Sequence, residues 1–303
     1  MDKVKDFNQV KNFNDLISDY SDLGFQASHL GEAAELIERM NKEETTIFFG
    51  FTANLVASGM RGIITEMCKK GFVDVVVTTA GAIEHDIMKS HKPYLKGSFM
   101  ANDNELHRKG INRIGNIFVP NERYVWLEKF VQKAFKEVYR NNKCVSPSEL
   151  AELFGMKLGK DSFLYWCWKN RIPVFCPGIS DGALGLNMYF FKQEHPDFCV
   201  DITGDMKELA DITINAEKTS AIILGGGITK HHIIGANILR DGLDYATYFT
   251  TAQEYDGSLS GAQTQEAKSW GKIKENAKSV SVYSDATISF PLVFSYLKEK
   301  KLI

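Results

Sequence analysis

The segment whose residues are best suited to catalysis is Ser269-Trp270-Gly271-Lys272, in which a lysine amine stands beside a large aromatic ring and a flexible glycine. A lysine kept neutral by burial can attack an electron-poor carbon and form a Schiff base. Glu266 lies one helical turn before Trp270, so its carboxylate could share the face of the ring. The alternative interpretations are a surface lysine next to a buried tryptophan, and a solvated helix carboxylate.

A second candidate segment is Gly225-Gly226-Gly227, which is followed closely by His231 and His232. Glycines after an apolar run let backbone N–H groups approach a pyrophosphate, because a residue without Cβ can come close and adopt positive φ. The triplet can also be a plain tight turn, and either histidine can be a core or helix-start residue. The spacing is not GxGxxG, so it only weakly indicates an ordinary Rossmann dehydrogenase.

Other short polar clusters also end apolar runs. They are Thr78-Thr79-Ala80-Gly81, Ser180-Asp181-Gly182, Thr251-Ala252 and Ser284-Asp285-Ala286. The carboxyl ends of parallel strands meet at one edge of a sheet, where backbone donors and small polar side chains collect ligands. Together with the glycine triplet, these clusters predict a single groove large enough for a nucleotide.

Apolar periodicity predicts the elements that position these residues. Strands are predicted at 46–51, 73–79, 172–175, 221–224, 245–249 and 280–283, and helices at about 27–40, 55–70 and 123–140, with a further helix start at Ser146-Pro147-Ser148-Glu149. Near-continuous apolar strands that alternate with amphipathic helices are typical of an α/β fold.

We therefore predict a Rossmann-like α/β fold, with a mostly parallel sheet flanked by helices on both faces and with helical additions. A single domain is expected over residues 1–303, because no linker rich in Pro and Ser and no internal repeat divides the chain. Residues 1–22 are expected to form a polar N-terminal extension.

The composition excludes several classes of protein. The 303 residues are 44% hydrophobic, and the formal net charge of −2 gives no basic patch for nucleic acid or an anionic membrane. No apolar run reaches the roughly 20 residues that span a bilayer, and the N-terminus lacks a secretory signal core. Five widely spaced cysteines without a CxxC pair indicate neither a disulfide framework nor a zinc site. We expect a soluble cytoplasmic protein without a metal.

Several long segments agree, in order, with one known family. The sequence resembles deoxyhypusine synthase in FQASHLG at 25–31, TTAG at 78–81, INRIGNIFVPN at 111–121, GGGITKHH at 225–232, SWGKI at 269–273 and SDAT at 284–287. The resemblance extends from about Phe25 to Val293, which is nearly the whole chain. Agreement of several unusual segments in the same order is more specific than any one of them.

The resemblance implies an NAD-dependent transfer of an aminobutyl group. In this family, NAD takes a hydride from the carbon beside the secondary amine of spermidine, a lysine captures the resulting imine, and diaminopropane leaves. The aminobutyl group then passes to a lysine of the translation factor that carries hypusine, and the hydride returns. This chemistry requires a hydride acceptor held against a C–H bond, a neutral lysine, and groups that hold a cationic chain.

Matched position by position, the resemblance implies that Lys272 is the Schiff-base nucleophile and that His231 assists proton transfer or orients the amine. Trp270 would stack along the polyamine, Glu266 would pair with one ammonium, and Tyr248 would line the substrate channel. The implied NAD-binding positions are Asn54, Thr79, Ala80, Gly81, Asp181, Gly225, Gly226, Gly227, Thr251, Ala252, Asp256, Gly257, Ser258, Ser260 and Asp285.

The sequence departs from the family within the expected substrate-binding site. Leu186 and Leu259 stand where aspartates are expected, His85 stands where a carboxylate is common, and Gly235 replaces an asparagine. A lost charge-assisted hydrogen bond typically costs about 1.5 to 3 kcal/mol, so two missing aspartates would weaken spermidine binding. The cofactor-binding positions match the family better than the donor-binding positions do.

Three functions stay open at this point. The first is a deoxyhypusine synthase that modifies the translation factor. The second is a relative that moves an aminobutyl group between small amines, as homospermidine synthases do, or that uses a modified polyamine. The third is a non-catalytic NAD-binding scaffold, against which Lys272 argues. The resemblance also implies a homotetramer with active sites at a dimer interface.

Overall fold

The computed structural model describes residues 13–303, and the first part of the predicted N-terminal extension, residues 1–12, lies outside them. The chain divides into two compact units. The sheet unit runs to Phe51 and adds Lys70–Val77 and Lys207–Ile303, whereas the helical unit comprises Thr52–Lys69 and Thr78–Met206. Each unit is discontinuous in sequence, and the expected single domain remains a prediction.

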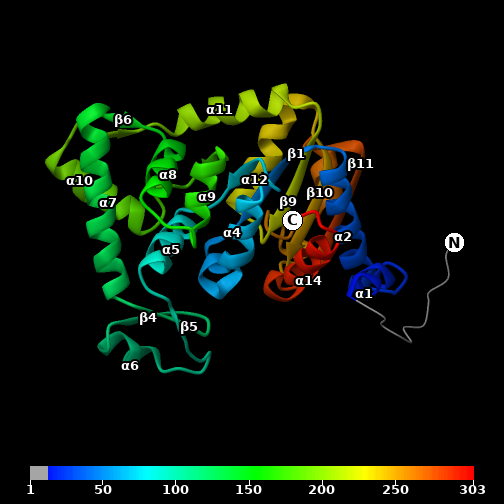
Figure 1. The fold of residues 1–303 in the computed structure, drawn as a ribbon, viewed down its shortest axis with the longest axis horizontal. Coiled ribbons are helices and arrows are strands. Elements are labelled where there is room, and N and C mark those ends of the chain that lie inside the picture. Colours follow the sequence, from blue (N-terminus) through cyan, green and yellow to red (C-terminus); the bar gives the residue numbers. More distant parts are fainter. Residues whose placement is uncertain (1–12) are drawn as a thin grey trace. The chain divides into compact units, whose positions relative to one another are not determined.

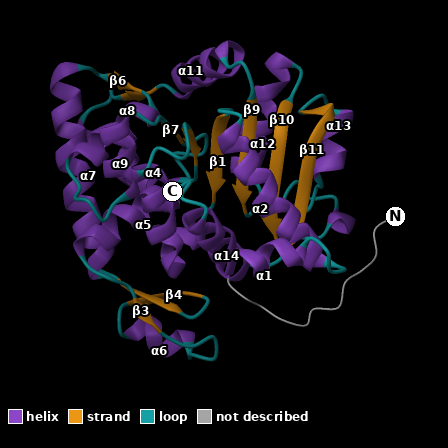
Figure 2. Ribbon diagram, turned by 45° about the vertical axis from the view of Figure 1, so that its right-hand side comes forward, coloured by secondary structure: helices purple, strands orange, loops and turns teal. Residues whose placement is uncertain are grey.

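Parallel strands form the centre of the sheet unit (Figure 2). They are β1 (Thr46–Phe51), β2 (Val75–Val77), β9 (Thr219–Leu224), β10 (Leu243–Thr250) and β11 (Ile273–Tyr283), in the order β11-β10-β9-β1-β2. The predicted strands at 46–51, 221–224, 245–249 and 280–283 are confirmed. β11 begins earlier than predicted, at Ile273, because its first half carries polar residues on an exposed edge strand, which apolar periodicity does not detect.

Helices cover both faces of this sheet. Phe290 of α14 (Ala286–Glu299) stacks on Phe49 of β1, with ring centroids 6.1 Å apart. Ile233 of α12 (Ile228–Ala236) lies against Gly50, where an added Cβ would stand 2.8 Å from Ile233 Cδ1. Because consecutive strand residues point to opposite faces, α12 and α14 cover opposite faces. The predicted Rossmann-like architecture is therefore confirmed.

The remaining helices of the sheet unit are α1 (Phe13–Tyr20), α2 (Gln26–Lys42) and α13 (Thr264–Ser269). α2 matches the helix predicted at 27–40, and its buried positions include Leu30, Ala34, Ile37 and Met40. These residues recur at helical spacing, so α2 buries one apolar face.

The helical unit consists mainly of helices (Figure 1). They are α3 (Ala53–Leu55), α4 (Arg61–Lys69), α5 (Ala80–His91), α6 (Asp103–Arg108), α7 (Glu122–Asn141), α8 (Pro147–Met156), α9 (Phe163–Asn170), α10 (Ala183–Glu194) and α11 (Ile202–Asn215), the last of which continues into the sheet unit. α7 matches the predicted helix at 123–140. α8 begins as predicted, because Ser146 and Glu149 form a capping box.

Short strands complete the helical unit. They are β3 (Leu95–Lys96), β4 (Ile111–Ile114), β5 (Ile117–Pro120), β6 (Cys144–Val145), β7 (Val174–Phe175) and β8 (Cys199–Val200). β4 and β5 pair as an antiparallel hairpin with β3 beside β5, and β6 pairs with β8 in parallel. The strand predicted at 172–175 is present as the shorter β7.

The helix predicted at 55–70 is not continuous, which corrects the sequence analysis. α3 is followed by a π-helical turn over Val56–Met60, and α4 starts at Arg61. Gly59 within the turn has φ 109°, a conformation that residues with a Cβ rarely adopt. The apolar spacing continues through the break, so periodicity alone could not locate it. The strand predicted at 73–79 is also shorter, because Thr79 is already the N-cap of α5.

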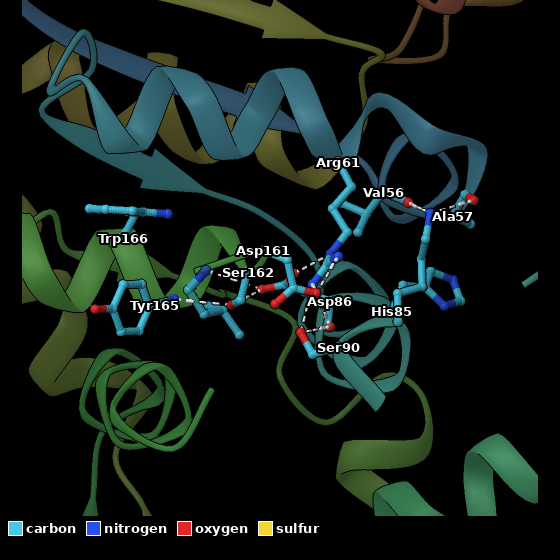
Figure 3. Close-up of polar contacts among 12 residues, drawn as sticks. Val56, Ala57, Arg61, His85, Asp86, Ser90, Asp161, Ser162, Tyr165 and Trp166 are labelled. Atoms are coloured by element: carbon cyan, nitrogen blue, oxygen red, sulfur yellow. Dashed lines mark hydrogen bonds and ion pairs between the residues drawn. The ribbon is translucent and has the colours of Figure 1, made fainter. Parts of the chain in front are cut away.

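A buried charged cluster connects α4, α5 and the start of α9 (Figure 3). The Asp86 carboxylate on α5 is fully buried and accepts hydrogen bonds from Arg61 Nε at 2.6 Å, Ser162 Oγ at 2.6 Å and Leu164 N at 3.1 Å. Arg61 also contacts Asp161, whose side chain is exposed. The Asp86 carboxylate is thus the common acceptor for groups from two segments, α4 and the start of α9.

Within residues 13–303, no helix is both long enough and apolar enough to cross a bilayer. In the same part of the chain, no group of three or more His, Cys, Asp or Glu side chains could hold a metal ion.

Candidate active site

A cavity of about 540 Å³ lies within the sheet unit. Its walls come from α12, β10, α13, the loop that precedes α13, and the segment that joins α13 to β11. The lining residues are Ile228, Lys230, His231, Ile234, Tyr248, Gly257, Leu259, Ala262, Gln263, Glu266, Ala267, Trp270 and Lys272. All six residues of the sheet unit that were predicted to act on the substrate, Lys272, His231, Glu266, Trp270, Tyr248 and Leu259, therefore line one cavity.

Lys272 is held by its backbone at the amino end of β11. Its N–H donates to the carbonyl of Ala267 at 3.0 Å, and its carbonyl accepts from Leu243 N at 3.1 Å. Gly271 precedes it with φ 66°, which lets the chain turn sharply at the end of α13. The position of Lys272 in the cavity thus depends on a glycine turn.

Lys272 is half-buried, whereas a Schiff-base lysine was expected to be buried. Its Nζ lies 5.0 Å from the centroid of the Trp270 ring, within cation–π distance. The Trp270 residue is itself 66% exposed, so its ring covers the amine on one side only.

His231, rather than His232, lines the cavity. α12 begins after Gly227, whose φ of 67° turns the chain from β9 into the helix. Desolvation and, second, the nearby charge of Lys272 lower the pKa of His231. The imidazole is therefore neutral near pH 7 and can accept a proton.

Tyr248 and Glu266 give the cavity its other polar groups. Tyr248 is buried on β10, and among the described residues its hydroxyl has no hydrogen-bond partner. Burial raises the pKa of Tyr248, so the hydroxyl stays protonated. Glu266 is exposed on α13 and is the one carboxylate among the lining residues. A cationic ligand would therefore meet a single negative charge in this cavity.

The predicted NAD-binding residues of the sheet unit follow three neighbouring strands. Gly225, Gly226 and Gly227 follow β9, Thr251 and Ala252 follow β10, and Asp285 follows β11. Because β9, β10 and β11 are adjacent and parallel, these three strand ends lie side by side, as predicted. The other two clusters, at 78–81 and 180–182, belong to the helical unit.

The glycine turn leaves little room for side chains. A Cβ on Gly226 would stand 2.7 Å from Ser260 Cα, and both Gly225 and Gly227 have positive φ. The loop that holds Asp256, Gly257, Ser258 and Ser260 can therefore approach the turn closely. The two carboxylates already accept hydrogen bonds within the protein: Asp256 accepts from Ser258 N at 2.7 Å, and Asp285 accepts from Thr287 N at 2.8 Å.

In the helical unit, the remaining NAD-binding candidates gather near the starts of α3, α5 and α10. A Cβ on Gly81 would stand 2.9 Å from Ala53 Cβ, which brings Asn54 and the 79–81 turn together. Thr79 Oγ1 is buried and has no partner within the described chain. Asp181 is exposed and precedes Gly182, the N-cap of α10. Helix starts that carry an orphaned hydroxyl and glycine turns fit an anionic cofactor.

The two predicted substrate residues of the helical unit differ in accessibility. His85 is buried on α5, with Nδ1 2.8 Å from Tyr94 Oη. Burial first, and the charge of Lys89 second, lower the pKa of His85 to about 4, so the ring is neutral and cannot replace a carboxylate. Leu186 is exposed on α10. The role of both residues in substrate binding stays a prediction.

Comparison with known proteins decides the family. The family model described as deoxyhypusine synthase matches residues 15–297. The chain belongs to the deoxyhypusine synthase family.

Its relatives cover most of the chain. It is 44% identical to the probable deoxyhypusine synthase of Pyrococcus furiosus, over 94% of this chain and 90% of that protein. It is 42% identical to the deoxyhypusine synthase of Senecio vernalis, over 95% of this chain and 86% of that protein. A crystal structure of a candidate deoxyhypusine synthase from Entamoeba histolytica has a TM-score of 0.70 and 28% identity, and covers 97% of this chain and 96% of that chain. As a member of the deoxyhypusine synthase family, the protein is an enzyme, a transferase.

Sequence reasoning missed one lysine in the cavity of this deoxyhypusine synthase family member. Lys230 is only 1% exposed, and its Nζ donates to the carbonyls of Ser260 at 3.2 Å and Ala262 at 2.8 Å. The same Nζ lies 4.9 Å from the centroid of the Tyr248 ring. Lys230 thus ties the 258–262 loop to α12. The one feature of the sequence that could have indicated Lys230 is its position in GGGITKHH. The neighbouring residues do not indicate that a lysine at this position is buried.

The burial of Lys230 predicts a pH-dependent stability. Burial lowers the pKa of Lys230 to about 8, below its ordinary value of 10.5, so the unfolded chain binds the proton more tightly. Stability should therefore rise between about pH 7 and about pH 10. The free energy of unfolding of the wild type, minus that of Lys230→Met, should increase by about 2 to 3 kcal/mol over this range in denaturant titrations.

The control for this prediction is Lys109→Met, which removes an exposed lysine. The free energy of unfolding of the wild type, minus that of Lys109→Met, should stay constant with pH. A constant difference for Lys230→Met as well would contradict the lowered pKa.

Proposed function

We propose that this protein is an NAD-dependent deoxyhypusine synthase. It transfers the aminobutyl group of spermidine to one lysine of the translation factor that carries hypusine, through a Schiff base on Lys272. The observation that carries the proposal is the shared cavity, in which Lys272, His231, Glu266 and Trp270 come together. Membership of the deoxyhypusine synthase family supports the same reaction.

The turns at the strand ends fit NAD as the cofactor. In the sheet unit, the residues proposed to bind it are the glycines at 225–227, the loop at 256–260 and Asp285. For the helical unit, the resemblance to the family implies Asn54, Thr79, Ala80, Gly81 and Asp181. The close approach of Ser260 to Gly226 and the orphaned Thr79 hydroxyl support this assignment. When bound, NAD supplies the two-electron oxidation that makes the donor carbon electrophilic, and the matching reduction at the end.

Lys272 carries the group during transfer. The deprotonated form of its amine adds to the C=N carbon of the oxidised donor, the bond from that carbon to the diaminopropane nitrogen breaks, and both N–H hydrogens of Lys272 end on the leaving amine. The amine of the acceptor lysine then repeats this exchange and frees Lys272. A neutral His231 in the same cavity can take and return the proton that moves in each exchange.

The other lining residues hold the substrate. Glu266 pairs with one ammonium of the polyamine, and the Trp270 ring and Leu259 lie along its methylene chain. Because Trp270 is mostly exposed, a neighbouring subunit is well suited to close this side of the cavity. This exposure supports a homotetramer with active sites at a dimer interface. We also infer that the enzyme acts in the cytoplasm, where its protein acceptor is made.

A transfer assay tests the proposal. The purified enzyme, NAD and spermidine labelled in the aminobutyl part are incubated with and without the cognate translation factor. Label should appear on the factor, at one lysine, only when enzyme and NAD are both present. Label on no protein, together with no release of diaminopropane, would sink the proposal and favour the non-catalytic NAD-binding scaffold.

Leu259 favours one alternative. It places an apolar side chain in the cavity and leaves Glu266 as the only carboxylate of the lining, which suits a less cationic or modified amine. In this alternative the enzyme passes the aminobutyl group to a small amine. Adding putrescine in place of the factor should then yield homospermidine faster than the factor becomes labelled.

A further inference from the structure

Four of the five cysteines, which are dispersed in sequence, lie in two pairs in space. Cys68 and Cys167 are buried, and burial first, with the neighbouring Cys68 thiol second, raises the pKa of Cys167. Cys144 and Cys199 form a second close pair. Both pairs lie within the helical unit. No disulfide framework was predicted from the sequence, because the five cysteines are odd in number, widely spaced and never in a CxxC pair. The pair on β6 and β8, Cys144 and Cys199, is more exposed than the pair of Cys68 and Cys167.

The strand register puts the β6 and β8 cysteines directly opposite each other. In the parallel pairing, Cys144 stands across from Cys199 and Val145 from Val200. Cys199 N donates to Lys143 O at 2.8 Å, and Asp201 N to Val145 O at 2.9 Å. Opposite residues of neighbouring strands point to the same face, and strands lie about 4.8 Å apart. Disulfides require Cα atoms about 4.4 to 6.8 Å apart, so the backbone already allows a bond.

Both strands are anchored by their neighbours. Asp205 of α11, which follows β8, accepts hydrogen bonds from Ser148 N and Ser148 Oγ of α8, which follows β6. Asp197, just before β8, contacts Tyr139 at the end of α7 and Lys143 just before β6. These contacts hold the two thiols together without any covalent bond, which raises the rate at which one thiol can attack the other.

Accessibility sets the order in which the thiols react. Cys199 is exposed and Cys144 is half-buried, whereas Cys68, Cys167 and Cys176 are buried. The hydrogen bond with Cys199 first, with burial second, raises the pKa of Cys144 to about 11, so little Cys144 thiolate exists until the neighbouring thiol has reacted. An external reagent should therefore meet Cys199 first.

We propose that Cys144 and Cys199 form a reversible redox site, which closes to a disulfide when it meets a small-molecule disulfide such as oxidised glutathione. The Cys199 thiolate attacks one sulfur of the reagent, which breaks its S–S bond and releases one thiol. Cys144 then attacks Cys199 Sγ and displaces the second thiol. The protein loses two electrons and two protons, and the reagent becomes two thiols.

The closed form would join the end of α7 to the start of α11 within the helical unit. β8 is the last strand before the chain passes at Met206 into the sheet unit. A disulfide here closes a long ring of chain, so it would restrict the unfolded ensemble. This site is independent of the proposed catalytic cavity, and its test does not require activity.

The test uses the full chain, purified in the reduced state. The folded protein is incubated with oxidised glutathione, denatured, alkylated, and measured by intact mass and peptide mapping. Two fewer cysteines should be alkylated than in an untreated sample, and one linked peptide pair should contain Cys144 and Cys199. The buried Cys68 and Cys167 serve as the internal control and should stay free.

Two single variants sharpen the result. In Cys144→Ser, the exposed Cys199 should keep glutathione as a stable mixed disulfide, because the resolving thiol is gone. In Cys199→Ser, no intramolecular disulfide should form. Full alkylation of the oxidised wild type would overturn the proposal, as would a linked peptide that contains Cys68, Cys167 or Cys176.

Discussion

Lys272→Arg lowers kcat/KM for aminobutyl transfer by at least about a thousandfold, because it removes the amine that carries the group. Arginine keeps the positive charge and the contact with the Trp270 ring, but its guanidinium stays protonated and cannot form a Schiff base. The measurement is single-turnover release of labelled diaminopropane. NAD binding by the variant, followed by titration, should stay close to that of the wild type and shows that the variant is folded.

Lys268→Arg is the matched control for this prediction. Lys268 lies on α13, four residues before Lys272, but its Nζ donates to the carbonyls of Glu275 and Ala277 and it does not line the cavity. The kcat/KM of the Lys268→Arg variant should change less than about threefold, because this substitution leaves the reacting groups in place. Equal activity of Lys272→Arg and Lys268→Arg would remove the basis of the catalytic assignment.

The second large effect concerns stability. Asp86→Ala removes the buried carboxylate that accepts hydrogen bonds from Arg61, Ser162 and Leu164 (Figure 3). It leaves the largely buried Arg61 guanidinium with the neutral Ser90 Oγ, to which Nη2 donates at 2.6 Å, and with Asp161 as its remaining carboxylate partner, whose side chain is exposed. Removing one member of a buried ion pair typically costs about 3 to 5 kcal/mol, because the remaining charge is desolvated without compensation. We expect the free energy of unfolding to fall by about this amount.

Urea titration followed by tryptophan fluorescence can measure this loss, since Trp126, Trp166 and Trp168 all belong to the helical unit. Asp161→Ala is the control, because it removes the exposed partner of the same arginine. Asp161 is 61% exposed at its side chain, so its loss should cost less than about 1 kcal/mol. If the two variants were equally destabilised, Asp86 would not be the centre of the cluster.

Local patterns in the sequence were sufficient for some of the regular elements, but α9, α10, α11 and α14 were not among those predicted. α2 and α7 were predicted almost to their ends, because each buries one face whose apolar residues recur at helical spacing. β1 was predicted because it is a continuous apolar run that is buried on both faces. The parallel arrangement followed from strands that are apolar on both faces. The break at Gly59 was missed, because a single glycine inside a helical pattern is compatible with a continuous helix.

The candidate site was predictable only in part. The residues of SWGK and GGGITKHH suggested a nucleophile and a turn, and the resemblance connected them to one reaction. That Lys272, at the amino end of β11, lies in the same cavity as Tyr248 on β10 and His231 on α12 depends on how α13 folds back. No spacing along the chain contains this information, since side chains from separate elements converge through packing.

The sequence by itself determined the α/β class, the strand ends that carry glycine and small polar residues, and the family to which these segments are similar. Tertiary structure alone decided which amines are buried and which thiols meet. Lys230 is buried because the 258–262 loop covers it, and Cys144 faces Cys199 because β6 pairs with β8. Burial and pairing are properties of contacts between distant segments, whereas a periodic pattern reports only on a residue's own helix or strand.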